Sequence, residues 1–165
     1  MMKYTLHTMA SEHREAVMNI FNYYIENSMS AYRQEMLPLE AFDRFLKLTE
    51  KYPAYVAQAE DKSVMGFGFL SAHKDIVEFS HTAEFTCFLH PDNLGVGLGG
   101  AILTRLEGEA KKAGITNILA SISSFNDRSL VFHEKHGFQQ CGRFYAVGEK
   151  NGRRFDTIWM QKLLN

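Results

Sequence analysis

The sequence predicts a mixed α/β fold with the element order β-α-α-β-β-β-α-β-α-β-β. Three observations favour this order. Apolar residues recur at helical spacing in the first third, strand-like apolar runs dominate the middle, and an Asn-Gly dipeptide joins two strand-like runs near the C-terminus. Strands and helices do not alternate regularly, so we expect a mixed sheet with helices packed on it.

The first third of the chain predicts one strand and two helices. "KYTLHTM" is strand-like and "MSAYRQEMLP" is typical of a loop. Between them, from Ser11 as the expected N-cap, apolar residues at i, i+3, i+4 and i+7 mark one helix face, namely Val17, Ile20, Phe21 and Tyr24. Pro38 suits the first turn of a second helix, which ends before Pro53.

The middle of the chain predicts three strands. "AYVAQAEDKSVMGFGFLSA" indicates a hairpin with its turn at 60–63. Gly66 and Gly68 on one face of its second strand would leave room for another group to approach. "EFSHTAEFTCFLH" is the third strand, and it leads into the glycine-rich stretch "NLGVGLGG" at 93–100.

The last third predicts two helices among three strands. The helix after the glycine-rich stretch has two lysines in its last turn and is stopped by Gly114. "ITNILASIS" is an apolar strand, and a short helix at about 127–136 is stopped by Gly137. "FQQCGRFYAV" and "RRFDTIWMQKLL" then flank Asn151-Gly152, which is a type I′ hairpin signal.

Composition limits the class of protein and its partners. The 165 residues suit a single domain, 1–165, since no repeat or linker interrupts them. A net charge of −1 gives no reason to expect nucleic acid or an anionic membrane as a partner. No apolar run approaches the ~18 residues of a membrane helix, the N-terminus lacks the apolar core of a secretory signal, and the two cysteines lack C-x-x-C spacing. We therefore expect a cytoplasmic protein.

The glycine-rich stretch predicts an anion site. A P-loop needs Lys and then Ser or Thr after the last glycine, but Ala101 and Ile102 follow here. A dinucleotide fingerprint needs an acidic residue at the end of the next strand, and 115–123 contain none. A third interpretation needs only a strand, a glycine turn and a helix start, whose backbone N–H groups converge on one anion. The alternative is a turn that only lets the helix pack close to the sheet.

A family resemblance is carried by "LGVGLGGAIL" after "FLHPD", followed by "SFNDRSLVFHEKHGF". Together they resemble the acetyl-CoA site of the GNAT-type N-acetyltransferases, whose Gln/Arg-x-x-Gly-x-Gly/Ala pattern matches 94–99 except at Leu94. The resemblance covers nearly the whole chain and is closest to the phosphinothricin N-acetyltransferase-like branch, through "YYIENSMSAYRQEM", "YPAYVAQAEDKSVMGFGF", "HTAEFTCFLHPD" and "VGEKNGRRFD". It implies the GNAT fold, with the pyrophosphate of acetyl-CoA bound at Leu94, Gly95, Val96, Gly97, Leu98, Gly99 and Gly100.

The resemblance also implies contacts with the pantetheine arm of acetyl-CoA. The backbone N–H groups at Cys87, Phe88 and Leu89 resemble those that bind the thioester carbonyl and the pantetheine amide. Cys87 needs no nucleophilic role, because direct transfer is the family mechanism. Asn126 resembles the asparagine that hydrogen-bonds this arm, and its alternative role is the N-cap of the next helix. Lys135 is a candidate contact for the nucleotide phosphates or else a solvated charge.

Glu84 and His133 are the candidate catalytic residues. Glu84 lies in the apolar run "AEFTCFL", where burial would raise the pKa of a carboxylate and suit it to act as a general base. It matches the glutamate of the resembled branch, and its alternative is a solvent-facing strand residue. His133 stands where many relatives carry a tyrosine acid, with a structural or solvated histidine as an equal alternative. No third ligand accompanies His133 and His136, so no metal is expected.

The segment before the third middle strand bears on the acceptor amine. Relatives that acetylate phosphinothricin or methionine sulfone carry F-x-x-R-x-A-Y, where this chain has Ile76 for the arginine and Phe79 for the tyrosine. An apolar residue cannot pair with a substrate carboxylate. We expect Tyr32 and Phe79 to line the pocket of a small primary amine, and the resemblance implies a homodimer. The alternatives are acetylation of a protein N-terminus or lysine, and a degenerate CoA-binding sensor marked by Leu94 and Ile76.

Overall fold

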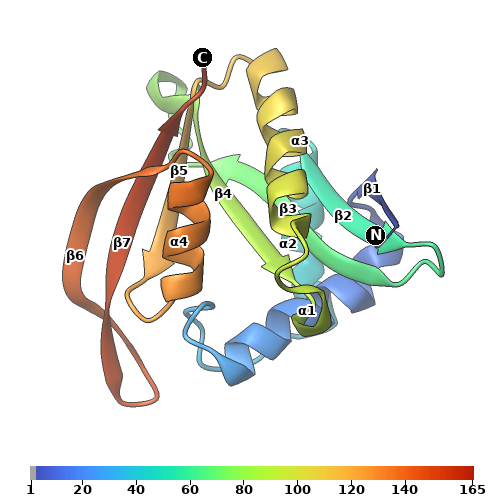
Figure 1. Cartoon of the computed structure of the whole chain (residues 1–165), viewed down its shortest axis with the longest axis horizontal. Coiled ribbons are helices and arrows are strands. Elements are labelled where there is room, and N and C mark those ends of the chain that lie inside the picture. The colour runs from blue at the N-terminus through green and yellow to red at the C-terminus, as the bar shows by residue number, and fades with distance from the viewer. Residues whose placement is uncertain (1–2) are drawn as a thin grey trace.

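The computed structural model describes residues 3–165, and the predicted element order is confirmed in them. One mixed sheet has the strand order β1-β2-β3-β4-β5-β7-β6, with α-helices on both faces (Figure 1). The strands are β1 (Tyr4–Thr8), β2 (Ala54–Ala59), β3 (Val64–Ala72), β4 (Thr82–Leu89), β5 (Asn117–Ser123), β6 (Gln139–Lys150) and β7 (Arg153–Leu163). The helices are α1 (Arg14–Asn27), α2 (Phe42–Thr49), α3 (Leu98–Lys112) and α4 (Asp127–Lys135). No helix in the described range is long and apolar enough to cross a membrane.

The two faces of the sheet carry separate hydrophobic clusters. One cluster packs α3 and α4 against the sheet and includes Ile102 and Phe85. The other packs α1 and α2 and includes Phe42, with Phe88 against it. Successive side chains of a strand point to opposite faces, so β4 contributes Phe85 to one cluster and Phe88 to the other. β4 therefore contributes to the hydrophobic clusters on both faces of the sheet.

The helix starts differ from the prediction at one residue. A 3-10 turn, η1 (Ser11–His13), precedes α1, and its cap is Ala10 rather than Ser11. The N–H of Ala10 donates to Nδ1 of His13 at 2.9 Å, so the side chain of the third residue bonds back to the cap, and no side chain at the cap position accepts from the first turn. Pro38 comes immediately before a second 3-10 turn, η2 (Leu39–Ala41), which continues into α2.

Gly66 and Gly68 of β3 serve packing rather than the approach of a ligand. A Cβ atom at Gly68 would lie 2.6 Å from Cγ2 of Ile102 on α3. One at Gly66 would lie 2.6 Å from Cδ2 of Leu89 at the end of β4. The room predicted at these glycines is therefore filled by the protein's own side chains, and it lets α3 lie close to the sheet.

β4 and β5 pair over only part of their length. Their parallel register ends where Glu84 lies opposite Leu119, although β4 continues to Leu89 and β5 to Ser123. Beyond this point the two strands diverge within the sheet (Figure 1). The edge of β4 that faces the gap therefore carries backbone N–H and C=O groups without a strand partner.

Candidate active site

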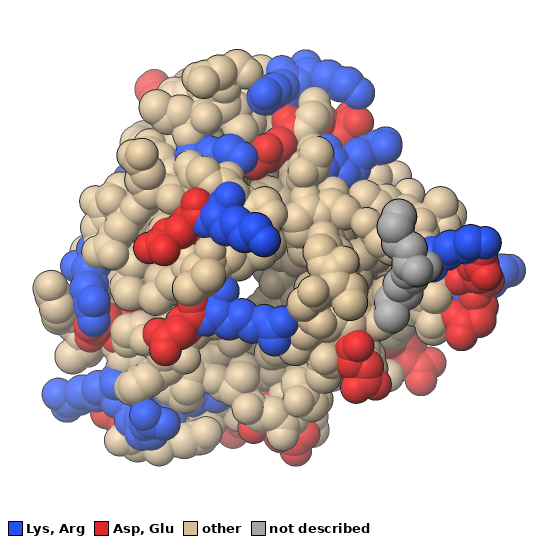
Figure 2. Space-filling model, viewed as in Figure 1, with Lys and Arg blue, Asp and Glu red and all other residues tan. Residues whose placement is uncertain are grey.

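A cavity of about 760 Å³ occupies the gap between β4 and β5. Residues 86–89 and 120–123 form its strand walls, and the glycine loop and α4 line it on one face of the sheet. α1 and the loop after it line it on the other face, through Tyr24, Ala31 and Tyr32. Figure 2 shows the surface hollowed near its centre, with lysine and arginine side chains beside the hollow; Arg128 and Lys135 of α4 belong to the cavity lining.

The start of α3 meets this cavity with unpaired N–H groups. The first intrahelical bond runs from the N–H of Ala101 to the C=O of Gly97 at 3.2 Å. The N–H groups of Leu98, Gly99 and Gly100 therefore have no acceptor within the helix. The first turn contains no acidic side chain that would compete for them. Together with the positive end of the helix dipole they form a site for an anion.

The glycines of the loop divide into two pairs. Gly95 and Gly97 have φ angles of 80° and 82°, which residues with a Cβ rarely adopt. Among the described residues, nothing lies within 4 Å of a Cβ built on Gly97. Gly99 and Gly100 face α4 instead, and a Cβ on Gly99 would lie 3.2 Å from the ring of Phe132. Packing accounts for the second pair, whereas the first pair forms an open cradle at Gly97, with the guanidinium of Arg128 beside Gly95.

The end of β4 forms the cavity wall next to this cradle. Cys87, Phe88 and Leu89 all line the cavity beyond the last β4–β5 pair. The hydroxyl of Tyr24 on α1 donates to the C=O of Leu89 at 2.6 Å, which fixes the strand end before the loop. Burial raises the pKa of the Cys87 thiol to about 12, which keeps the thiol protonated at neutral pH.

Asn126 lies at the start of α4, where its predicted N-cap role is confirmed. Its Oδ1 accepts a hydrogen bond from the N–H of Ser129 at 3.1 Å, so the side chain is the N-cap of α4. Asn126 also lines the cavity, and its NH₂ group has no acceptor among residues 3–165. The cap therefore leaves a donor for a ligand. Lys135, at the other end of α4, lines the cavity too, whereas Val96 is half exposed outside the lining.

His133 lines the cavity as a buried, neutral imidazole. It is 6% exposed and contacts the rings of Phe85, Phe132 and Phe138. Its Nδ1 donates to the C=O of Ser129 at 2.7 Å. Burial lowers the pKa of His133 to about 4. At pH 7 the proton therefore lies on Nδ1, and Nε2, which has no partner among the described residues, carries a lone pair.

Glu84 lies beside the cavity, on the same face of β4 as Thr86, which lines it. The Nδ1 N–H of His73 donates to Oε1 of Glu84 at 2.8 Å, and the Glu84 side chain is 31% exposed. The burial expected from its apolar neighbours is thus incomplete, because the side chain points away from the face that Phe85 occupies. The charge of Glu84 reaches Tyr32, whose pKa is raised first by burial and also by this carboxylate.

His73 is a site residue that sequence reasoning missed. It follows β3 directly, and the antiparallel register already pairs Ser71 with Glu84 across β3 and β4. Counting that register along the predicted strands would have brought His73 close to Glu84. Phe79 packs on the His73 ring, with ring centroids 6.0 Å apart, and lies outside the cavity lining. Ile76 is 54% exposed and also lies outside it.

Tyr32 forms the cavity wall opposite the glycine loop. Its hydroxyl is 3.0 Å from Oγ of Ser121 on β5, so the loop after α1 bonds across to the strand. Its ring stacks on Phe155 of β7, with centroids 5.3 Å apart. Tyr32 was predicted to line the pocket, and it does line the cavity. Ser121, which was not predicted, lies beside it in the cavity lining.

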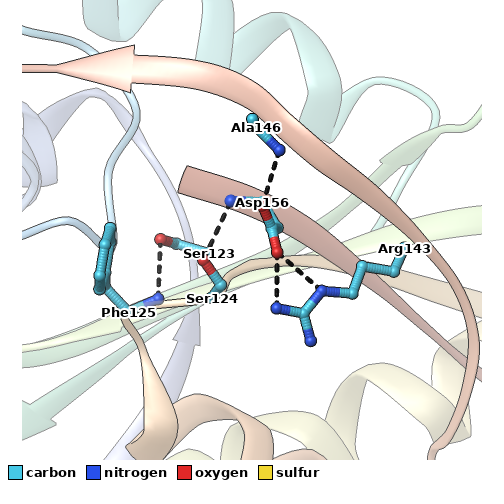
Figure 3. A network of polar contacts seen from close by, with 6 residues as sticks. All are labelled: Ser123, Ser124, Phe125, Arg143, Ala146 and Asp156. Carbon is cyan, nitrogen blue, oxygen red and sulfur yellow. Dashed lines mark hydrogen bonds and ion pairs between the residues drawn. The ribbon is translucent and has the colours of Figure 1, made fainter. Parts of the chain in front are cut away.

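Asp156 of β7 holds the loop from β5 to α4 (Figure 3). Its carboxylate accepts from Nε of Arg143 at 2.8 Å and from the N–H of Ala146 at 2.6 Å. Its own N–H donates to Oγ of Ser124 at 3.0 Å. In the same loop Oγ of Ser123 accepts from the N–H of Phe125 at 3.3 Å. This network fixes the short segment that delivers Asn126 to the cavity.

Comparisons with known proteins identify the family of the chain. Residues 9–159 match the sequence model of the acetyltransferase (GNAT) domain family. The chain is 36% identical to L-amino acid N-acyltransferase MnaT of Escherichia coli over 114 residues, which span 69% of this chain and 66%, just under two thirds, of that relative. It is 31% identical to phosphinothricin N-acetyltransferase of Streptomyces viridochromogenes, over 89% of this chain and 80% of that one. The crystal structure of a GNAT superfamily phosphinothricin acetyltransferase from Sinorhizobium meliloti in complex with AcCoA matches with a TM-score of 0.93 and 28% identity, over 99% of this chain and 90% of that one.

Proposed function

Because the chain belongs to the GNAT acetyltransferase family, we propose that it transfers the acetyl group of acetyl-CoA to the primary amine of a small molecule. Two relatives are named for amino acid and phosphinothricin acylation, which supports an amine acceptor of that size. The observation that carries the proposal is the continuity of one cavity from the open cradle at Gly97 to the unpaired edge of β4. A long ligand with a diphosphate and a linear amide arm fits both parts.

The residues of the cavity suit each part of acetyl-CoA. The N–H groups of 98–100 are donors for the pyrophosphate, and Arg128 and Lys135 add positive charge on the same side. The free NH₂ of Asn126 and the gap-facing backbone of 87–89 are donors for the arm. When bound, acetyl-CoA supplies an activated acetyl thioester, and no metal is required for this.

Glu84 is the proposed general base. It takes a proton from the attacking amine, directly or through one water, as the C–N bond forms and the C–S bond breaks. The His73 N–H holds the carboxylate in one orientation. His133 has its Nδ1 proton committed to Ser129, so we assign it to the wall and not to proton donation. The departing thiolate needs little help, since an ordinary thiol has a pKa of about 8.5.

A small acceptor is favoured over a protein. Tyr32 bonds across to Ser121 and narrows the cavity on the side away from the glycine loop, whereas a peptide chain needs an open groove. We also propose a cytoplasmic homodimer. The two cysteines are free, and the edge strand β6 exposes Phe144, Tyr145 and Val147, which suits it to an interface.

A panel of amines tests the proposed function. Thiol release from acetyl-CoA is measured with amino acids and with the amine that each gives on decarboxylation. We expect turnover with at least some amines and no strong preference for the acid, because the lysine and arginine in the lining lie on α4, beside the glycine loop. A preference for the acid above about a hundredfold, roughly 2.7 kcal/mol, would contradict this and point to an exposed cation such as Lys74. Binding of acetyl-CoA without turnover of any amine would favour the sensor alternative.

A further inference from the structure

Lys150 is a buried lysine with no carboxylate partner. It is the last residue of β6 and only 1% exposed, and no ion pair among residues 3–165 includes it. Its Nζ donates to the carbonyl oxygens of Ile25 at 2.6 Å, Ser28 at 2.8 Å and Ala31 at 2.8 Å. An ammonium has three N–H donors, so every donor of this buried charge is satisfied by backbone.

The three carbonyls belong to the end of α1 and the loop that leaves it. The C=O of Ile25 is one of the last four of the helix, which lack an intrahelical donor. α1 has no basic side chain in its last turn. Lys150 therefore supplies the positive charge at the negative end of the helix dipole from 125 positions along the chain. It also sets the path of the chain from Ser28 to Ala31.

The hairpin that carries Lys150 contacts the same loop at two further points. The N–H of Asn151 donates to Oε1 of Gln34 at 3.3 Å. The ring of Phe155 lies against Gly148, where a Cβ would clash with it, and stacks on Tyr32. The loop residues 28–34 are thus held between the hairpin and the cavity.

We propose that Lys150 is a positioning residue for the acceptor amine. By fixing residues 28–31, its ammonium holds Ala31 and Tyr32 in the cavity wall, although Lys150 itself lies outside the lining. The kinetic consequence rests on the proposed function, whereas the effect on the loop does not. If Lys150 served global stability alone, its loss would weaken the binding of acetyl-CoA and of the acceptor amine to the same extent. If Lys150 positions the loop, its loss should weaken the binding of the acceptor amine only.

Kinetics of Lys150→Met separate these two roles. We expect the KM for the acceptor to rise about tenfold, with kcat and the Kd for acetyl-CoA changed less than about twofold. Lys150→Arg keeps the charge and the donors and should recover part of the loss. In a double-mutant cycle with Tyr32→Ala the two effects on kcat/KM should be less than additive, since Lys150 acts through Tyr32. Lys51→Met, at an exposed lysine, is the matched control and should behave as the wild type.

Cleavage by trypsin after Arg33 tests the loop without any activity. Arg33 is exposed and adjoins Tyr32, so release of the loop should speed its cleavage about tenfold in Lys150→Met, as followed by mass spectrometry. Gln34→Ala removes one exposed hairpin contact and should speed cleavage about two- to threefold in a variant with an unchanged core. If Lys150→Met does not fold, Gln34→Ala alone shows whether the hairpin holds the loop. The proposal would be overturned if both variants were cleaved after Arg33 at the rate of the wild type. Equal losses of affinity for the acceptor and for acetyl-CoA would also overturn it. Absence of turnover in the wild type would overturn only the proposed function.

Discussion

The two sides of the cavity are assembled in opposite ways. The glycine-loop side uses one continuous segment, 94–100, whose backbone N–H groups and positive φ angles create the cradle. The side of the α1–α2 loop uses side chains from distant parts of the chain: Tyr32 meets Ser121 across 89 positions, and Lys150 meets Ile25 across 125. The first side presents its donors through local backbone geometry, so a motif reveals it. The second depends on tertiary contacts, so substrate choice can change there while the cradle stays the same.

The largest effect should come from Glu84→Gln on the acceptor side. Removing a general base costs about 10²–10⁴ in rate, so we expect kcat to fall by that range. The affinity for acetyl-CoA should hardly change, because Glu84 is outside the cradle. Part of the loss should return at high pH, where more of the amine is already deprotonated. The measurement is a pH–rate profile of both proteins on one good acceptor.

Glu78→Gln, at an exposed carboxylate in the segment before β4, is the control for this substitution. It should leave kcat within about threefold of the wild type, the level expected for a solvated charge. If Glu84→Gln behaved in the same way, Glu84 would have no part in the proton transfer, and the acceptor side would lose its proposed base.

A smaller effect should come from Gly97→Ala on the glycine-loop side. The added methyl enters open space in the cradle, so the Kd for acetyl-CoA should rise at least about tenfold, or 1.4 kcal/mol. The positive φ also costs about 1 kcal/mol of stability. Gly114→Ala is the matched control. Gly114 also has a positive φ, of 79°, and open space where a Cβ would lie, but it follows the C-terminal end of α3, away from the cradle.

Calorimetric titration and chemical unfolding of both glycine variants check this prediction. Both should lose similar stability, whereas only Gly97→Ala should lose affinity. In the wild type, acetyl-CoA at 100 times its Kd should stabilise the fold by about 2.7 kcal/mol in the presence of a chelator, and NAD or ATP should not. An unchanged affinity of Gly97→Ala for acetyl-CoA would indicate that the loop glycines only allow α3 to pack close to the sheet.

The smallest effect on rate should come from His133→Asn, whose amide keeps a donor for Ser129. At pH 7.5 we expect kcat to change less than about threefold, because the native imidazole is already neutral. Stability should respond instead. The unfolded chain protonates this histidine as the pH falls through about 6.5, and the folded protein only near 4. The wild type should therefore lose up to about 3 kcal/mol more than the variant across that window.

Urea unfolding of both proteins at pH 7 and pH 4.5 measures this difference directly. Another buried histidine, His13, titrates in both proteins and cancels in the comparison. A hundredfold loss of kcat with intact acetyl-CoA affinity would instead identify His133 as the acid that the sequence suggested, and would give the glycine-loop side a chemical role.

Residues with local signals were predictable from the sequence, and residues with long-range partners were not. The glycine turn before α3 and the Asn126 cap before α4 each depend on neighbours within a few positions, and both were found. Gly68 was misinterpreted because the group that fills its space, Ile102, comes from another element. His73 and Lys150 were missed for the same reason. Lys150 binds a helix end that a single sequence does not reveal, whereas His73 reaches Glu84 through a strand register that has to be counted between two predicted strands.

The buried sulfur of Cys87 has a consequence for chemical selectivity. A thiolate in the wall of a site that holds a thioester would exchange with it, and the protein would acetylate itself in place of an amine. Because burial raises the pKa of Cys87 far above neutral, the thiol stays protonated at pH 7. In the proposed complex with acetyl-CoA, burial of the Cys87 thiol would therefore prevent it from competing with the amine for the acetyl group. An incoming amine then meets no internal rival for the donor.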